Sequence, residues 1–113
     1  MSERFDLLSV GRAAVDLYGA QIGSPLEDVQ SFEKSLGGSP ANVAVGASRL
    51  GLKVAMLSRV GDEHMGRFVR AELAKEGVDV SALRTDPERL TALVLLAIRD
   101  RATFPLILSL IHI

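Results

Sequence analysis

The sequence contains no cysteine and only two histidines, His64 and His112, among its 113 residues. The absence of cysteine excludes disulfide bonds, thiolate nucleophiles and cysteine-built zinc sites, and it fits a reducing compartment. Two histidines give little support to a histidine-built metal site, so we expect this chain to hold no metal. A cytoplasmic location is the default expectation, because the charged start Met-Ser-Glu-Arg-Phe-Asp lacks the apolar region of a signal peptide.

The sequence also lacks a large excess of charge of either sign. Lys and Arg number 13 and Asp and Glu number 14, which gives a net charge of −1. Without a basic stripe or a long run of like charge, the sequence indicates neither a nucleic-acid partner nor a membrane surface. The longest apolar stretch reaches only about half of the ~20 residues that a membrane helix requires.

Two common phosphate-binding motifs are missing as well. No glycine is followed by Lys-Ser or Lys-Thr, so the sequence has no P-loop. After the first expected strand the chain reads Gly-Arg-Ala-Ala-Val-Asp where a dinucleotide fingerprint requires Gly-x-Gly-x-x-Gly.

The most informative segment that is present reads Gly-Gly-Ser-Pro-Ala-Asn, residues 37–42. Ser39 is a good N-cap and Pro40 suits the first helical position, so we expect a helix over residues 40–50 that ends at Gly51. Gly37 and Gly38 can bring bare backbone amides up to a ligand, and a helix N-terminus adds partial positive potential. The alternative is a plain Gly-Gly turn followed by an exposed Asn42.

The hydrophobic pattern predicts alternating strands and helices. We expect a buried strand over residues 5–11, a strand over 53–60, and a strand over 91–98 that pairs through a turn at 99–103 with residues from 104 onward. We expect a second helix over 63–76, capped by Asp62 and ended by Gly77. Residues 17–36 read as an irregular insertion with short extended segments near 20–22 and 30–36. Apolar positions that we expect on the buried helix faces are Val43, Ala47 and Leu50 in the first helix and Met65, Phe68, Val69 and Leu73 in the second.

The order of four motifs resembles the N-terminal part of the PfkB, or ribokinase-like, carbohydrate kinases. These motifs are Gly-x-x-x-x-Asp after the first strand (Gly11 to Asp16), Gly-Gly-x-x-x-Asn (Gly37 to Asn42), Arg-Leu-Gly and Val-Gly-Asp. The resemblance covers residues 5–107 and implies an α/β fold, the N-terminal part of an αβα sandwich, in which the 17–36 insertion contributes strands to a small β lid.

The resemblance also implies an activity, the ATP-dependent phosphorylation of a sugar hydroxyl. Asp16 and Asn42 would hydrogen-bond the sugar over Gly37 and Gly38. The Gly-Ala-Gly-Asp segment that supplies the catalytic base in the family has no counterpart here, so we expect ATP and Mg²⁺ to be bound mainly by a C-terminal part outside this chain, and the chain alone to be inactive. A homo-oligomer formed through the lid is a further implication of the resemblance.

Within the family, the resemblance is greatest to the branch that phosphorylates 5-dehydro-2-deoxygluconate at its 6-hydroxyl in inositol breakdown. Because that substrate is an acid, an arginine should meet its carboxylate, and Arg12, Arg99 and Arg101 are the candidates. Kinases of 2-keto-3-deoxygluconate and of fructose share the same motifs and remain alternatives. From other classes, a non-catalytic sugar-binding relative and a small self-contained interaction domain also remain open.

Residues 108–113, Leu-Ser-Leu-Ile-His-Ile, depart from what the family leads us to expect after residue 107. The hexapeptide is what CTG TCT CTT ATA CAC ATC encodes, the end of a transposase adapter used to prepare sequencing libraries. We therefore expect a kinase portion over residues 1–107 and a non-native read-through tail over 108–113. A native apolar strand is the alternative, and the codons of the gene decide between the two.

Overall fold

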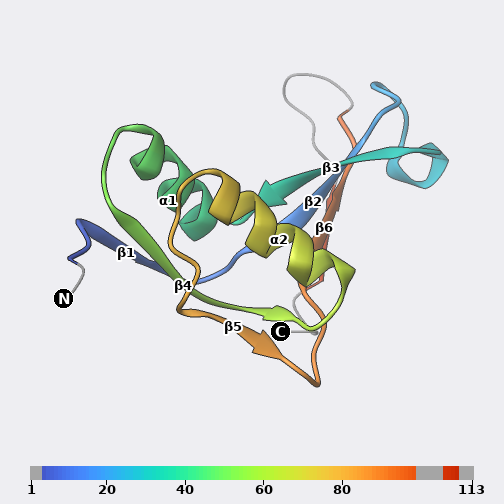
Figure 1. The fold of residues 1–113 in the computed structure, drawn as a ribbon. Coiled ribbons are helices and arrows are strands. Elements are labelled where there is room, and N and C mark those ends of the chain that lie inside the picture. The colour runs from blue at the N-terminus through green and yellow to red at the C-terminus, as the bar shows by residue number, and fades with distance from the viewer. Residues whose placement is uncertain (1–3, 99–105, 110–113) are drawn as a thin grey trace.

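The computed structural model describes residues 4–98 and 106–109 (Figure 1). In these residues the strands form two sheets, and the helices lie between strands in the sequence. In chain order the elements are β1 Leu7–Val10, β2 Ala14–Gly19, the short 3-10 helix η1 Leu26–Asp28, β3 Phe32–Gly37, α1 Ser39–Arg49, β4 Val54–Gly61, α2 His64–Lys75, β5 Leu83–Asp86, β6 Ala92–Leu96 and β7 Leu106–Ser109. The predicted α/β class is confirmed.

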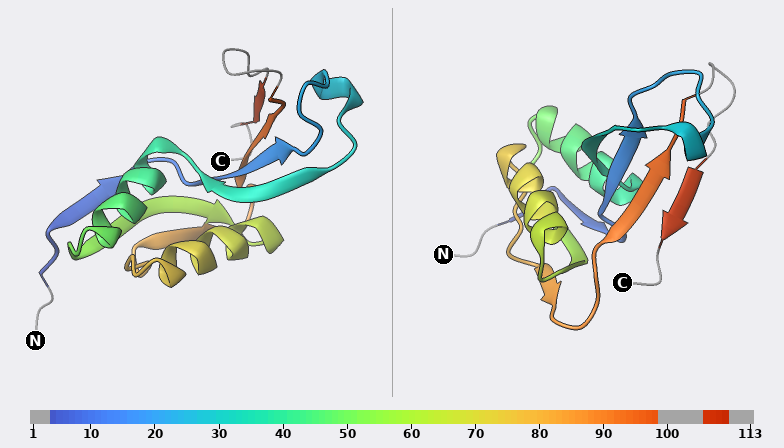
Figure 2. Two further views of the ribbon diagram at one scale, coloured as in Figure 1. Left: turned by 90° about the horizontal axis from the view of Figure 1, so that it is seen from above. Right: turned by 90° about the vertical axis from the view of Figure 1, so that its right-hand side faces the viewer.

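The first sheet, which we call the body sheet, has the strand order β1-β4-β5 and is parallel throughout. Both helices pack on one of its faces, as the two views in Figure 2 show. Their buried side chains meet the central strand β4 in one core, to which α1 contributes Ala41 and Ala44, α2 contributes Val69 and Leu73, and β4 contributes Met56.

The second sheet, which we call the outer sheet, has the order β3-β2-β6-β7 and is mixed. Strand β2 runs antiparallel to β3 and parallel to β6. This sheet corresponds to the expected lid, and the extended segment predicted near 30–36 is confirmed as β3. The segment predicted near 20–22 is wrong, because those residues bend and turn, and the strand lies earlier as β2.

Helix α1 differs from the prediction at its start and in its buried face. The N-cap is Gly38, with φ +93°, so Ser39 is already helical and makes no capping hydrogen bond. The buried face carries Ala41 and Ala44, whereas Val43 and Leu50 are 55% and 85% exposed. Small side chains face the sheet because the helix lies close to it, which turns the larger Val43 outward.

Helix α2 follows its predicted stripe but not its predicted cap. Val69 and Leu73 are buried, and Met65 and Phe68 are partly buried against the same core. The cap is Glu63 rather than Asp62, since the Glu63 side chain accepts a hydrogen bond from the Gly66 amide. The predicted stop at Gly77 is confirmed by its φ of +83°.

Strand β1 is not buried on both sides, contrary to the prediction. Leu8 and Val10 are 53% and 61% exposed on the face of the body sheet opposite the helices. The short strand β5 was not predicted from the sequence. Within the described residues, no helix combines the length and apolar character that crossing a membrane requires.

The predicted pairing at the C-terminal end is confirmed, because β7 runs antiparallel to β6. The turn at 99–103 lies outside the described residues. Leu108 and Ser109 take part in β7 opposite Val94 and Leu93, but backbone pairing is open to any extended segment, so the origin of the tail stays a prediction. Residues 110–113 also lie outside the described part of the chain.

Candidate functional site

The carboxylate of Asp16 lies directly over Gly37. The antiparallel register sets Asp16 opposite Ser35 and Ala14 opposite Gly37. A Cβ added at Gly37 would coincide with the carboxyl group of Asp16, so the space that any other residue would fill is taken by that carboxylate. The structure therefore brings together two of the predicted site residues, which are 21 positions apart in the sequence.

Gly38 makes a second close approach at the same place. A Cβ at Gly38 would lie 2.6 Å from the Arg12 carbonyl oxygen, and its φ of +93° also favours glycine. A Cβ at Gly11 would lie 2.7 Å from the Pro40 ring. The connection from β1 to β2 therefore lies against the connection from β3 to α1, and only the two glycines let them approach this closely.

Asn42 lies in the first turn of α1, and its amide donates to the Gly38 carbonyl oxygen at 2.9 Å. Its side chain is exposed at the helix start. Asn42 is thus placed next to the Gly37-Gly38 pair, as both the ligand hypothesis and the plain-turn alternative require. Its contact with a ligand stays a prediction.

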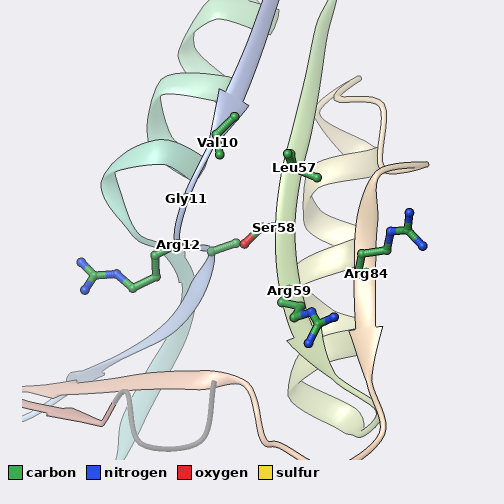
Figure 3. Close-up of a pocket in the computed structure, with 8 residues that line it drawn as sticks. Val10, Gly11, Arg12, Leu57, Ser58, Arg59 and Arg84 are labelled. Atoms are coloured by element: carbon green, nitrogen blue, oxygen red, sulfur yellow. The ribbon is translucent and has the colours of Figure 1, made fainter.

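Arg12 lies in the connection between β1 and β2 and lines a pocket of about 520 Å³ between the carboxyl end of β1 and the middle of β4. Its buried Nε has no hydrogen-bond partner among the described residues. Figure 3 shows its guanidinium pointing away from the two other arginines of this pocket, Arg59 and Arg84. Arg59 is paired with Asp86 at 3.3 Å. The other two predicted carboxylate partners, Arg99 and Arg101, lie outside the described residues.

Three neighbouring groups set the electrostatics of the site. Burial raises the pKa of Asp16, while a hydrogen bond from Tyr18 and the positive charge of Arg12 act in the opposite direction without cancelling that effect. Burial and the Asp16 carboxylate together raise the pKa of Tyr18, which therefore stays a neutral donor near neutral pH. An ionised Asp16 here is a strong hydrogen-bond acceptor, and among the described residues the side chain that donates to it is Tyr18.

Tyr18 is a candidate residue that the sequence analysis missed. Its hydroxyl lies 3.5 Å from Asp16 Oδ2, and it borders a pocket of about 430 Å³ together with Glu33 and Ser35. The signal was available in principle, because residues two apart on a strand share one face. It could not be used without knowing that residues 14–19 form a strand.

Comparison with known proteins agrees with this geometry. The pfkB family carbohydrate kinase profile matches residues 4–107, and the chain therefore belongs to this family. The family predicted from the four motifs is thus confirmed.

Among curated proteins, the chain is 44% identical to the 5-dehydro-2-deoxygluconokinase of Lacticaseibacillus casei over 86 residues, which cover 76% of this chain and 26% of that protein. It is 48% identical to the enzyme of the same name from Clostridium perfringens over 80 residues, 71% of this chain and 24% of that protein. The chain thus spans about a quarter of the length of these relatives.

Solved structures show the same fold. A sugar kinase from Pyrococcus horikoshii superposes with a TM-score of 0.85 at 39% identity, covering 91% of this chain and 35% of that one. The fructokinase of Halothermothrix orenii superposes with a TM-score of 0.83 at 32% identity, covering 92% of this chain and 37% of that one. The expected ribokinase-like fold is therefore confirmed.

Replacing Gly37 by alanine should displace Asp16, because the new methyl group would occupy the position of its carboxylate. Under the sugar-binding function proposed below, and in a protein of the relatives' length that contains this chain, we expect Gly37→Ala to raise the KM for the sugar by about tenfold or more, which corresponds to the loss of roughly one charge-assisted hydrogen bond. Gly46→Ala is the matched control, since a Cβ at Gly46 meets nothing within 4 Å. Equal KM values for the two variants would show that the position of Asp16 over Gly37 does not affect sugar binding.

Proposed function

We propose that this chain is the sugar-binding N-terminal part of an ATP-dependent kinase that phosphorylates a hydroxyl of a sugar or sugar acid. The observation that carries the proposal is the Asp16 carboxylate seated over Gly37, beside a helix start that holds Asn42. Membership of the pfkB family supports it. Since the chain spans only part of its relatives, the activity belongs to the longer protein.

In this mechanism the residues of this chain position the hydroxyl that receives the phosphoryl group. Asp16 accepts hydrogen bonds from one or two sugar hydroxyls, and Asn42 both donates and accepts at the same ligand. Phosphoryl transfer depends mainly on in-line placement and electrostatic stabilisation, so holding the sugar in one orientation is a direct contribution to rate.

The nucleotide and the catalytic base belong to the part of the relatives that this chain does not span. When bound there, ATP would supply the phosphoryl group, and Mg²⁺ would neutralise the charge that develops on it. The ATP complex described for the Pyrococcus horikoshii sugar kinase supports this choice of nucleotide. Since the matched region covers 33% of that protein, its remaining two thirds leave room for a nucleotide site.

The substrate we propose is 5-dehydro-2-deoxygluconate, phosphorylated at its 6-hydroxyl. The names of the curated relatives support this substrate, and the buried, unpartnered Nε of Arg12 supports a ligand with a carboxylate. Guanidinium binds carboxylate bidentately, so Arg12 is well suited to hold the acid end while Asp16 holds hydroxyls. A role in inositol breakdown and a cytoplasmic location belong to the same proposal.

A fructokinase is the second candidate, favoured by the likeness to the Halothermothrix orenii structure. Arg12→Ala separates the two in the full-length protein. For the keto acid we expect kcat/KM to fall about 10- to 100-fold, as for a lost hydrogen bond between charged groups, while kcat/KM for fructose stays within about twofold.

Arg84→Ala is the control for this experiment, because Arg84 is exposed and lines the same pocket but points away from Arg12. An unchanged preference for the acid in Arg12→Ala would remove Arg12 as the carboxylate partner. Phosphorylation of no sugar by the wild-type full-length protein would reject the kinase itself and favour a non-catalytic sugar-binding relative.

Tyr18→Phe should change the pH dependence of the reaction. The hydroxyl of Tyr18 lowers the pKa of Asp16 against the larger raising effect of burial, so its removal leaves the pKa of Asp16 higher. Because Asp16 acts as an anion, and the anion is lost as pH falls through this pKa, the acid limb of kcat/KM should move to higher pH.

The measurement for Tyr18→Phe is a pH profile with a neutral sugar, so that no substrate carboxylate titrates. The variant and the wild type should converge at pH values well above the limb, where Asp16 is ionised in both. A limb that stays in place or moves to lower pH would show that Tyr18 does not act on Asp16.

A further inference from the structure

The chain crosses between the body sheet and the outer sheet at three places, and the third differs from the first two. The crossings from β1 to β2 and from β3 to α1 contain Gly11 and Gly38, both with positive φ. The third crossing, residues 87–91 between β5 and β6, contains no glycine. In Figure 1 the chain leaves β5 at the lower edge of the body sheet and rises from there into β6.

Glu63 ties this third crossing to helix α2, with one carboxylate oxygen hydrogen-bonded to each. Oε1 accepts from the Gly66 amide at 2.8 Å, and Oε2 accepts from the Thr91 amide at 2.8 Å. The Thr91 hydroxyl in turn accepts from the buried Gly61 amide at 3.0 Å. One carboxylate therefore joins the end of β4, the first turn of α2 and the residue that precedes β6.

The surrounding glycines leave room for this carboxylate. A Cβ at Gly61 would lie 2.6 Å from Glu63 Oε2 and 2.7 Å from the Arg89 carbonyl oxygen, and a Cβ at Gly66 would collide with the Gly61 carbonyl oxygen. The Gly-Asp-Glu-His-Met-Gly segment thus acquires a physical role that sugar contact does not give it.

The contacts of Glu63 favour its charged form. Burial alone would raise its pKa, but hydrogen bonds from Thr91, Gly66 and Met65 outweigh burial and hold the pKa of Glu63 below its ordinary value. Hydrogen bonds to an ionised carboxylate are about twice as strong as those between neutral groups, so Glu63 ties the two sheets more firmly than a neutral side chain would.

The tie reaches Asp16 through strand pairing. Thr91 immediately precedes β6, in which Ala92 pairs with Ala14 and Val94 pairs with Asp16. A shift of Thr91 relative to β4 therefore moves the register partner of Asp16, whereas Glu63 itself does not contact the Asp16 carboxylate in any hydrogen bond of the described residues.

We propose that Glu63 is a positioning residue, which holds β6 and its neighbour β2 so that Asp16 stays in place for the sugar. The proposal rests on the proposed function for its effect on the sugar, but its structural part stands on the contacts above. The alternative is that Glu63 only caps α2.

The two roles use different oxygens, and two variants separate them. Aspartate is a good N-cap, so Glu63→Asp keeps the bond to the Gly66 amide, but its shorter side chain cannot also reach the Thr91 amide. Glu63→Gln keeps the length and one accepting oxygen, while its NH₂ group would face one of the two amide donors. Asp62→Asn is the matched control, because the Asp62 side chain is exposed and its contact within the described residues is a 3.7 Å ion pair with Arg67.

The first readout is hydrogen–deuterium exchange of the full-length protein. In Glu63→Asp we expect about tenfold faster exchange over residues 14–19 and 91–96 and no change over 64–75, because one strong hydrogen bond is lost and local opening becomes more favourable. Glu63→Gln removes the charge that strengthens both hydrogen bonds, so we expect faster exchange over 14–19, 91–96 and 64–75 together. Unchanged exchange at 14–19 and 91–96, or faster exchange in α2 alone, would leave Glu63 as a helix cap and overturn the proposal.

The second readout is the kinetics of sugar phosphorylation below the melting temperature of each variant. We expect the KM for the sugar to rise about tenfold with the KM for ATP unchanged, which a cap alone would not produce. Faster exchange with an unchanged sugar KM would overturn the positioning role. Should the wild type phosphorylate no sugar, the kinase proposal fails, and the exchange measurement still decides whether Glu63 joins the sheets.

Discussion

The contact on which the rest of the site depends is the packing of the Asp16 carboxylate against the backbone of Gly37. A charged side chain can lie there only because β3 ends in a residue without a Cβ, directly before a helix start. The next residue, Gly38, is partly exposed and also lacks a side chain, so its backbone is open to a ligand beside the carboxylate. Strand pairing, glycine and the helix start thus act at a single point, where β2, β3 and α1 meet.

That point lies at the junction of two sheets, which creates a mechanical requirement. Asp16 belongs to the outer sheet, whereas Asn42 stands on a helix that packs on the body sheet. A sugar bound by both residues would bridge the two sheets, so their relative position affects every hydrogen bond to the ligand. Gly11 and Gly38 allow the backbone segments to approach closely at two crossings, and the Glu63 carboxylate binds the third. The junction of the two sheets is therefore both closely packed and held in one arrangement.

The sequence could predict the parts that depend on local signals. Three predicted features depend on neighbouring residues only, and the structure confirms them. They are a helix directly after the Gly-Gly pair, the end of α2 before Gly77, and the apolar stripe of α2. The family followed from motif order for the same reason. Strand β2 was missed because Ala14, Asp16 and Gly19 are poor strand formers. They mask the preference of Val15 and Tyr18 for a strand, which pairing with β3 and β6 reinforces.

The predicted helix caps were wrong for a related reason. Ser39 and Asp62 are good N-caps by type, but Gly38 takes the first position through its positive φ, and Glu63 caps α2 because Thr91 holds its other oxygen. Contacts with residues far along the chain therefore overrode local preference. That Asp16 lies near Gly37 was expected from the family resemblance, but their direct contact depends on a strand register that no local pattern encodes.

One face of the body sheet carries no helix among the described residues. Parallel sheets are almost always covered on both faces, yet among the described residues the helices cover one, and Leu8, Val10 and Leu57 are 53%, 61% and 38% exposed on the other. The structurally matched part amounts to 35% of the Pyrococcus horikoshii kinase. A second helical layer on this face would complete an αβα sandwich and enclose the apolar pocket beside Arg12. Enclosure would lower the local dielectric, and the hydrogen bonds that Arg12 donates to a ligand and that Asp16 accepts from it would then be stronger than at an open surface.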